Sequence, residues 1–237
     1  MAIDHALYSW PCAGLEDRSR VIAASVAGRA DGIIASYGTL KAFRTEFGDT
    51  TPILKLDLTT VTVGGEYPVT PYRLAWTVDQ AVRLGAGAVL TFVQLGSEEE
   101  LDSLTAAAKT AVEADDAGLD YVCEIMPVAS PRFPDPTTPD AVAAAARTGD
   151  ELGATVIKTS MPRPVVGVET AISACNVPVI LAGGSRNSDE DAFLFDVETA
   201  MKSRARGVAV GRNVWGSPNP EAMVSRLRAV LDGISDD

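Results

Sequence analysis

Short apolar runs alternate with longer segments whose apolar residues recur at helical spacing. The short runs are rich in β-branched residues, which is typical of strands buried on both faces. After an opening strand at the N-terminus, the predicted strands are 32–36, 52–58, 88–93, 121–126, 154–160, 177–182 and 207–210. The predicted helices are 17–29, 39–47, 78–85, 97–116 with Ser97 as N-cap, 140–152, 168–175, 189–204 and 221–231.

Strict alternation of strands and helices implies parallel strands joined by right-handed crossovers. Eight such units within 237 residues predict a closed (β/α)8 TIM barrel that occupies residues 1–237 as a single domain. An open doubly wound sheet is the alternative. It would usually carry a Gly-x-Gly-x-x-Gly turn after its first strand, and the sequence has none there.

The strand at 154–160 carries Lys158 near its end. A lysine inside a strand is unfavourable unless it is paired or neutral, and burial favours the neutral amine. A neutral ε-amine is a nucleophile that can form a Schiff base with a carbonyl. The alternative is a strand-end lysine that reaches into water.

Polar residues gather at the carboxyl ends of the predicted strands, where barrels of this class build their active sites. Asp4 and Lys158 form the natural pair of acid/base and nucleophile. Lys55 could assist electrostatically, but strand parity places it on the same face as Asp57, which favours an ion pair. For His5, a supporting role and plain packing stay open. The polar residues at strand ends are Asp4, His5, Lys55, Asp57, Glu124, Lys158 and Ser160.

Two glycine-containing loops follow the last two strands, and loops in these positions form the recurrent phosphate site of such barrels. Glycine lets backbone N–H groups approach an anion, and an arginine adds a charged donor. The alternative is that the glycines only make tight turns and the arginine pairs with a surface carboxylate. The residues concerned are Gly183, Gly184, Ser185, Gly211 and Arg212.

Composition narrows the classes of partner. A formal net charge of −12 argues against nucleic acid and anionic membranes. No apolar run approaches the roughly 20 residues of a membrane helix, and no secretory signal precedes the first strand. Three widely spaced cysteines indicate reduced thiols and predict a cytoplasmic protein. With His5 as the single histidine, a zinc site is not expected, and no acidic cluster demands magnesium.

Several motifs resemble those of the DhnA-type class I aldolases, the archaeal-type fructose-bisphosphate aldolases and their relatives. The similarity covers nearly the whole chain in the correct order. The motifs are Asp-His at 4–5, Gly-Ala-Gly-Ala-Val at 85–89, Gly-Ser-Glu-Glu-Glu-Leu at 96–101, Ala-Thr-Val-Ile-Lys at 154–158, Val-Pro-Val-Ile-Leu-Ala-Gly-Gly at 177–184, Asp-Glu-Asp-Ala-Phe at 189–193 and Gly-Val-Ala-Val-Gly-Arg-Asn-Val-Trp at 207–215.

This resemblance implies a metal-independent enzyme without a cofactor, in which Lys158 forms the Schiff base and Asp4 handles protons. Gly183, Gly184, Gly211 and Arg212 would hold the phosphate of a dihydroxyacetone-phosphate-like group. The family also implies a homo-oligomer, often a decamer. The chain starts directly at strand one, without the longer N-terminal segment usual in relatives, so assembly or the lower barrel plug is expected to differ.

One position departs from the family. Members with sugar-bisphosphate aldolase activity have a tyrosine proton donor just before the proline that follows strand five, and this chain has Met126 there. A thioether cannot donate a proton. Glu124 lies on the same strand face and is a substitute acid/base, or alternatively a partner for a basic residue in the barrel.

The leading expectation is a class I aldolase that acts on a phosphorylated ketose, fructose-bisphosphate aldolase-like, with release of dihydroxyacetone phosphate. The alternatives within the family are a transaldolase-like synthase of the 2-amino-3,7-dideoxy-heptulosonate type and a thiolase acting on a phosphorylated dione. An alternative of another class is a non-covalent sugar-phosphate isomerase or phosphate-binding barrel. The Gly-, Pro- and Thr-rich segment 59–77 is the candidate substrate loop.

Overall fold

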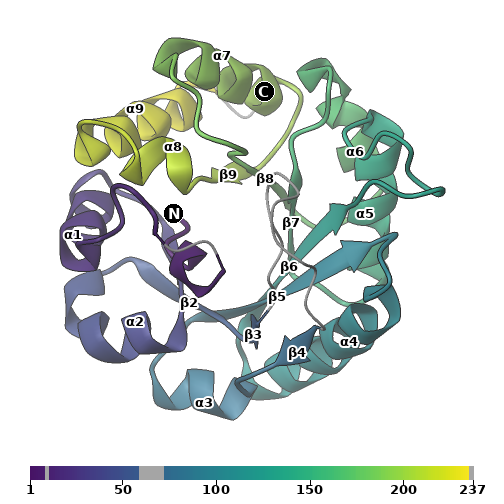
Figure 1. Ribbon diagram of the computed structural model, residues 1–237, viewed down its shortest axis with the longest axis horizontal. Coiled ribbons are helices and arrows are strands. Elements are labelled where there is room, and N and C mark those ends of the chain that lie inside the picture. The colour runs from purple at the N-terminus through teal and green to yellow at the C-terminus, as the bar shows by residue number, and fades with distance from the viewer. Residues whose placement is uncertain (9–10, 59–71, 235–237) are drawn as a thin grey trace.

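The computed structural model describes residues 1–8, 11–58 and 72–234. A ring of helices surrounds a cylinder of strands (Figure 1). The helices are α1 (Arg18–Ala27), α2 (Tyr37–Phe43), α3 (Val78–Arg83), α4 (Glu100–Ala117), α5 (Pro139–Glu151), α6 (Val168–Ser173), α7 (Glu190–Lys202), α8 (Arg212–Trp215) and α9 (Pro220–Asp232), with 3-10 turns η1 (His5–Leu7), η2 (Arg44–Phe47) and η3 (Val165–Gly167). The strands are β1 (Gly32–Ala35), β2 (Thr51–Lys55), β3 (Asp57–Leu58), β4 (Arg73–Leu74), β5 (Ala88–Leu95), β6 (Asp120–Pro127), β7 (Val156–Ser160), β8 (Val179–Ala182) and β9 (Gly207–Ala209).

Seven strands form one parallel sheet in the order β1-β2-β5-β6-β7-β8-β9, which is their order along the chain. Residues 1–3 take the eighth position. The N–H of Ala2 donates to Val210 O at 2.9 Å, and the N–H of Ile3 donates to Ile34 O at 2.9 Å. The N-terminal segment therefore joins the end of β9 to β1 and closes the ring, so the predicted (β/α)8 barrel is confirmed.

The inside of the barrel is layered because every second residue of a strand points inward. Towards the amino ends of the strands the inward residues are apolar, and one buried cluster joins Ala2, Ile34, Leu90, Val122 and Ala209. Two residues further along several strands, the inward residues are charged: Asp4 after Ala2, and Glu124 after Val122. The larger apolar cluster lies between the strands and the surrounding helices. Among these inward-facing residues, the charged ones thus lie in the half of the barrel nearer the carboxyl ends of the strands.

Most predicted elements are present, and the differences lie at their ends. The helix expected at 97–116 begins at Glu100, because Ser97 Oγ accepts the N–H of Glu99 and forms a turn before the helix. The helix expected at 39–47 begins at Tyr37 behind the N-cap Ser36 and tightens into η2 after Phe43. The short helix α8 was not predicted.

The segment expected as one loop at 59–77 contains a strand. Residues 59–71 lie outside the described residues, but β4 pairs antiparallel with β3, with Asp57 opposite Leu74. Tyr72, next to β4, donates its hydroxyl to Asp57 Oδ2 at 3.1 Å. The end of this segment is therefore fastened to the barrel by backbone and side-chain hydrogen bonds.

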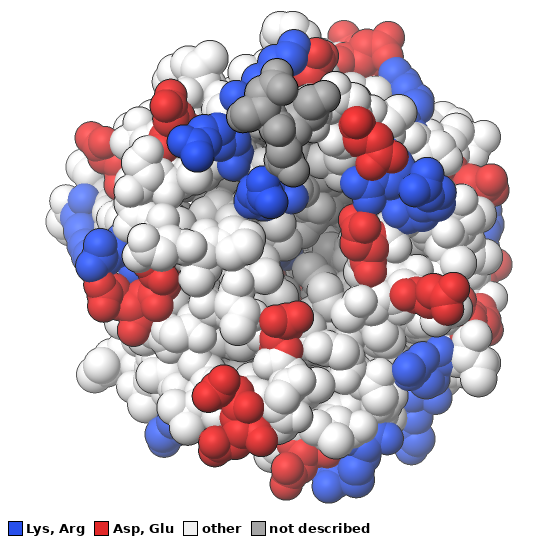
Figure 2. All heavy atoms as spheres, turned by 180° about the vertical axis from the view of Figure 1, so that it is seen from behind, with Lys and Arg blue, Asp and Glu red and all other residues white. Residues whose placement is uncertain are grey.

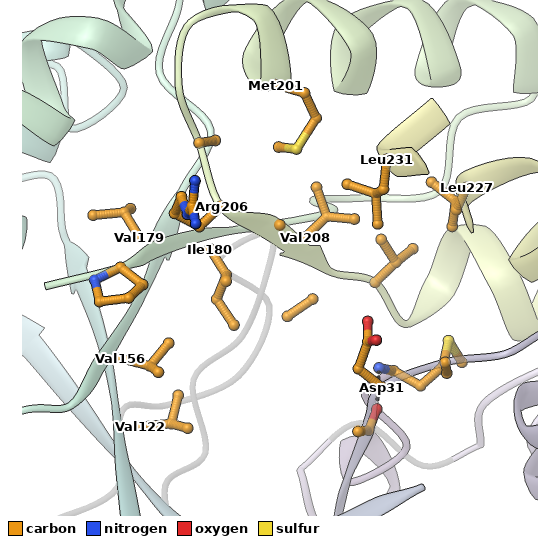
Figure 3. A pocket seen from close by; sticks show the side chains of 18 of the residues that line it. Asp31, Val122, Val156, Val179, Ile180, Met201, Arg206, Val208, Leu227 and Leu231 are labelled. Carbon is orange, nitrogen blue, oxygen red and sulfur yellow. Dashed lines mark hydrogen bonds between the residues drawn. The ribbon is translucent and has the colours of Figure 1, made fainter. Parts of the chain in front are cut away.

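A cavity of about 1310 Å³ opens at the amino ends of the strands. The face opposite to that of Figure 1 is hollowed at its centre (Figure 2). Val122, Val156, Ile180 and Val208 line this cavity, and Asp31 and Arg206 also border it (Figure 3). It lies at the other end of the barrel from the charged layer and is not the candidate active site. In the described ranges, no helix has the length and apolarity that crossing a membrane requires.

Candidate active site

Lys158 and Glu124 form an ion pair inside the barrel. They occupy paired positions on the neighbouring strands β7 and β6, so their side chains leave the sheet side by side. Lys158 Nζ lies 2.6 Å from Glu124 Oε1, and the side chains are 6% and 12% exposed. The carboxylate can accept a proton from the amine at this distance. The sequence left two alternatives for Glu124, a substitute acid/base or a partner for a basic residue. The structure gives it a basic partner, and this partner is Lys158, the candidate nucleophile.

Asp4 is buried at the end of the N-terminal segment, near both lysines of the barrel. His5 Nδ1 lies 3.6 Å from Asp4 Oδ1. Burial alone would raise the pKa of Asp4, but His5, Lys55 and Lys158 together hold it well below its usual range. His5 begins the turn η1, and its ring lies against Tyr8 and Trp215 with centroids 5.3 and 5.5 Å away. Asp4 is thus an ionised carboxylate beside the two lysines.

The ion pair expected between Lys55 and Asp57 is present, and both side chains are almost fully buried. Asp57 also accepts the backbone N–H of Phe92 and the hydroxyl of Tyr72. Burial alone would lower the pKa of Lys55, but the carboxylates of Asp57, Glu124 and Asp4 raise it above its ordinary value. Lys55 is therefore a charged ammonium in this site.

The two glycine-containing loops lie side by side after β8 and β9, where Gly183 N donates to Ala209 O at 3.2 Å. Gly184 has a φ of +66°, in the left-handed region, and open space beside it. Gly211 is crowded, since a methyl group on its Cα would lie 2.7 Å from His5 Cε1. Ser185 is exposed, and the buried Nε of Arg212 has no hydrogen-bond partner among the described residues. These loops offer N–H groups and one cation to an anion.

Asn213 fastens these two loops together, a role that the sequence reading did not assign to it. Its Nδ2 donates to Gly183 O at 2.8 Å and to Ser185 O at 3.1 Å, and its Oδ1 accepts the N–H of Asn187 at 2.7 Å. The side chain is buried. An asparagine directly after the Gly-Arg pair was visible in the sequence, but its partners on the other loop were not.

Two further predicted positions line the same side of the barrel. Ser160, two residues beyond Lys158, has a buried hydroxyl with no partner in the described part of the chain. Met126, two residues beyond Glu124, is half-buried. Within the described ranges, no three His, Cys, Asp or Glu side chains are grouped as ligands for a metal ion, and the expectation of no metal stays a prediction.

Comparisons with known proteins agree with this arrangement. The model of the DeoC/LacD family of aldolases matches residues 1–217. A 2-amino-4,5-dihydroxy-6-oxo-7-(phosphonooxy)heptanoate synthase from Streptomyces griseus is 32% identical over 229 residues, which cover 97% of this chain and 82% of the relative. A 2-amino-3,7-dideoxy-D-threo-hept-6-ulosonate synthase from Halobacterium salinarum is 32% identical over 236 residues, covering 99% of this chain and 86% of that protein.

A solved archaeal fructose-1,6-bisphosphate aldolase, with its catalytic lysine covalently bound to the carbinolamine intermediate of the substrate, has the same fold. It superimposes with a TM-score of 0.86 at 27% identity, over 98% of this chain and 92% of that chain. The family match, the relatives and the barrel lead to one conclusion. The chain belongs to the DeoC/LacD family of aldolases and is a class I, Schiff-base aldolase.

Proposed function

We propose that this aldolase makes and breaks the carbon–carbon bond between dihydroxyacetone phosphate and an aldehyde, with Lys158 as the Schiff-base residue. The observation that carries the proposal is the buried ion pair of Lys158 with Glu124 in the charged layer of the barrel. This layer lies at the carboxyl ends of the strands, where the loops of Gly183 and Gly211 also begin.

Glu124 serves in the proposal as the base and acid of imine formation. It takes a proton from the Lys158 ammonium, and the neutral amine then attacks the ketone carbon to give a carbinolamine. The resulting carboxylic acid returns the proton to the carbinolamine hydroxyl, which leaves as water. Asp4, already ionised, would accept the proton that the iminium ion loses from its α-carbon as the enamine forms.

The phosphate of the ketone is proposed to bind between the two glycine-containing loops. Gly184 and Ser185 would contribute backbone N–H groups from one loop, since the N–H of Gly183 is donated to Ala209 O, and Gly211 would let the chain pass close to the anion on the other. Arg212 would supply the positive charge, because its Nε is buried without a partner in the described residues. Ser160 would offer its unpaired hydroxyl to the substrate.

The aldehyde partner is proposed to be an amino acid aldehyde rather than glyceraldehyde 3-phosphate. The name of the Streptomyces griseus relative describes a chain with hydroxyls on carbons 4 and 5, an oxo group on carbon 6 and a phosphate on carbon 7. Cleavage between carbons 4 and 5 of that chain gives dihydroxyacetone phosphate and a four-carbon amino aldehyde acid. Fructose bisphosphate would need a second phosphate site, whereas the name of this relative describes a compound with a single phosphate.

Borohydride trapping tests the Schiff base. The protein is reduced in the presence of dihydroxyacetone phosphate, and its intact mass and peptides are measured. An adduct on Lys158 is expected, and Lys158→Met abolishes it. Lys109→Met, on the exposed face of α4, is the matched control and should trap normally. The absence of any adduct with phosphorylated ketones would refute the proposal.

Aldol assays with two aldehydes then test the partner. Aspartate semialdehyde is expected to condense with dihydroxyacetone phosphate at least about tenfold faster than glyceraldehyde 3-phosphate. The reverse preference would restore the fructose-bisphosphate aldolase that the sequence first suggested. A homo-oligomer and a cytoplasmic location also stay predictions, and light scattering on the purified protein tests the first.

A further inference from the structure

Met126, on the same face of β6 as Glu124 and two residues beyond it, has no proton to give to the aldehyde. Carbon–carbon bond formation leaves negative charge on the aldehyde oxygen, and that oxygen must receive a proton. Glu124 is held 2.6 Å from Lys158, and Asp4 is assigned to the proton of the α-carbon, so the aldehyde oxygen needs a donor of its own. The donor has to come from elsewhere in the barrel mouth.

We infer that the phenol of Tyr8 donates this proton, and that the N-terminal turn of the barrel therefore replaces the missing tyrosine of β6. The inference rests on the proposed function. Tyr8 follows the turn η1, and its N–H donates to His5 O at 3.1 Å, which bends the chain back after Asp4. Its ring lies 5.3 Å from that of His5, centroid to centroid. The ring is therefore held by the end of the first strand.

Three charged residues from different parts of the barrel act on the phenol together. Asp4 ends the N-terminal strand, Glu124 lies on β6, and Arg212 begins α8 after β9. A group that interacts with all three lies near the carboxyl ends of these strands, on the same side of the barrel as the Lys158–Glu124 pair. The side chain is half-buried, so its hydroxyl can meet a substrate that enters the barrel.

The environment keeps Tyr8 in its protonated form. Burial raises the pKa of the phenol, and the carboxylates of Asp4 and Glu124 raise it further, against a smaller opposite effect of Arg212. A protonated phenol is what a donor needs at neutral pH, because the oxygen created by the bond-forming step is more basic than a phenolate. Met126 can make no such transfer, since a thioether has no proton to give.

The step balances as follows. The enamine carbon on Lys158 attacks the aldehyde carbon, and the π pair of the carbonyl moves to its oxygen. That oxygen takes the phenolic proton of Tyr8 as the iminium ion re-forms. Water at the open mouth then returns a proton to the phenolate. In the cleaving direction the same proton moves from the substrate hydroxyl to the phenolate.

Tyr8→Phe separates this step from the steps before it. Three quantities are measured: borohydride trapping of dihydroxyacetone phosphate on Lys158, deuterium exchange into dihydroxyacetone phosphate in D2O, and condensation with the aldehyde. Trapping and exchange are expected to stay within about threefold of the unmodified protein, because neither needs the aldehyde. Condensation is expected to fall at least about 10²-fold, the usual contribution of a positioned acid.

Tyr37→Phe is the matched control, because Tyr37 stacks on Trp76 outside this cluster and the phenyl ring preserves the stack. Its three rates should be unchanged. Equal loss of all three rates in Tyr8→Phe would make Tyr8 a ligand of the ketone or its phosphate and overturn the inference, as would condensation that stays normal. Failure of the unmodified protein to form any adduct would instead count against the proposed Schiff base on Lys158.

Discussion

In the proposed mechanism, the contact between Lys158 and Glu124 sets the order of proton transfers during imine formation. Lys158 Nζ and Glu124 Oε1 lie 2.6 Å apart, which is close enough for a proton to pass directly between them. The same carboxylate is the nearest base that can remove the proton when a ketone arrives. In the proposed mechanism, Glu124 is the ion-pair partner of Lys158 in the free protein and the base that activates it in the complex.

Replacing Glu124 with glutamine should slow imine formation. The amide keeps the size of the side chain but cannot take the proton from Lys158. We expect the rate of borohydride-trappable adduct formation with dihydroxyacetone phosphate to fall at least about 10²-fold in Glu124→Gln. Glu98→Gln, an exposed glutamate just before α4, is the control. An unchanged rate in Glu124→Gln would leave Glu124 as an ion-pair partner only.

Asp4 should make the folded protein sensitive to acid. Its pKa is lowered on folding, so the folded state favours the ionised carboxylate, and this contribution is complete above the unfolded pKa of about 3.9. It is lost as the pH falls through the lower folded pKa, because the unfolded chain then binds a proton that the folded chain does not.

Asp4→Asn removes this dependence, since the amide does not titrate. Urea unfolding at pH 7 and at about pH 3.5 should therefore show a larger stability difference between the two proteins at pH 7. Asp116→Asn, at an exposed position late in α4, should show no such change between the two pH values. A difference that grew towards acid pH would mean that burial dominates and that Asp4 is neutral in the fold.

At the scale of elements, the alternation of side chains along a strand let the sequence predict which residues of one strand share a face. Lys55 and Asp57 were expected to share a face, and they form an ion pair. This alternation does not predict the register between neighbouring strands. The register of β6 and β7 is what places Glu124 opposite Lys158. Contacts between loops were equally hidden, because the partners of Asn213 lie 26 to 30 residues away along the chain.

Asn213→Ala should loosen the proposed phosphate site without touching the Schiff base. The substitution removes three hydrogen bonds that hold the loop of Gly183 to α8. The KM for dihydroxyacetone phosphate is expected to rise about tenfold or more, while trapping of unphosphorylated dihydroxyacetone stays as it was. Asn176→Ala, which removes one exposed side-chain hydrogen bond to Asp150, is the control. Equal loss with both ketones would show that Asn213 supports the barrel rather than the phosphate loops.

For the whole molecule, alternation of strands and helices was enough to predict the barrel, because eight parallel units of this length close on themselves. The sequence was less informative about how the ring closes. The opening strand was expected as an ordinary strand, yet only residues 1–3 pair with their neighbours, and η1 follows at once. This early turn could not be foreseen from periodicity in so short a segment. It also brings the ring of Tyr8 against that of His5, directly after Asp4.

Ile3→Ala tests whether these few residues close the barrel. Ile3 is 1% exposed within the apolar cluster between strands and helices, and its N–H bonds to β1. Loss of a buried isoleucine side chain should lower the free energy of unfolding by about 2–5 kcal/mol, measured by urea denaturation. Leu101→Ala, at a residue 75% exposed on α4, should change it by less than about 0.5 kcal/mol. If Ile3→Ala lowered the free energy of unfolding no more than Leu101→Ala does, residues 1–3 would not contribute to closing the barrel, and the seven strands of the sheet would hold it alone.

Lys158 should still trap dihydroxyacetone phosphate in the folded Ile3→Ala protein, because β6 and β7 position it independently of the first strand.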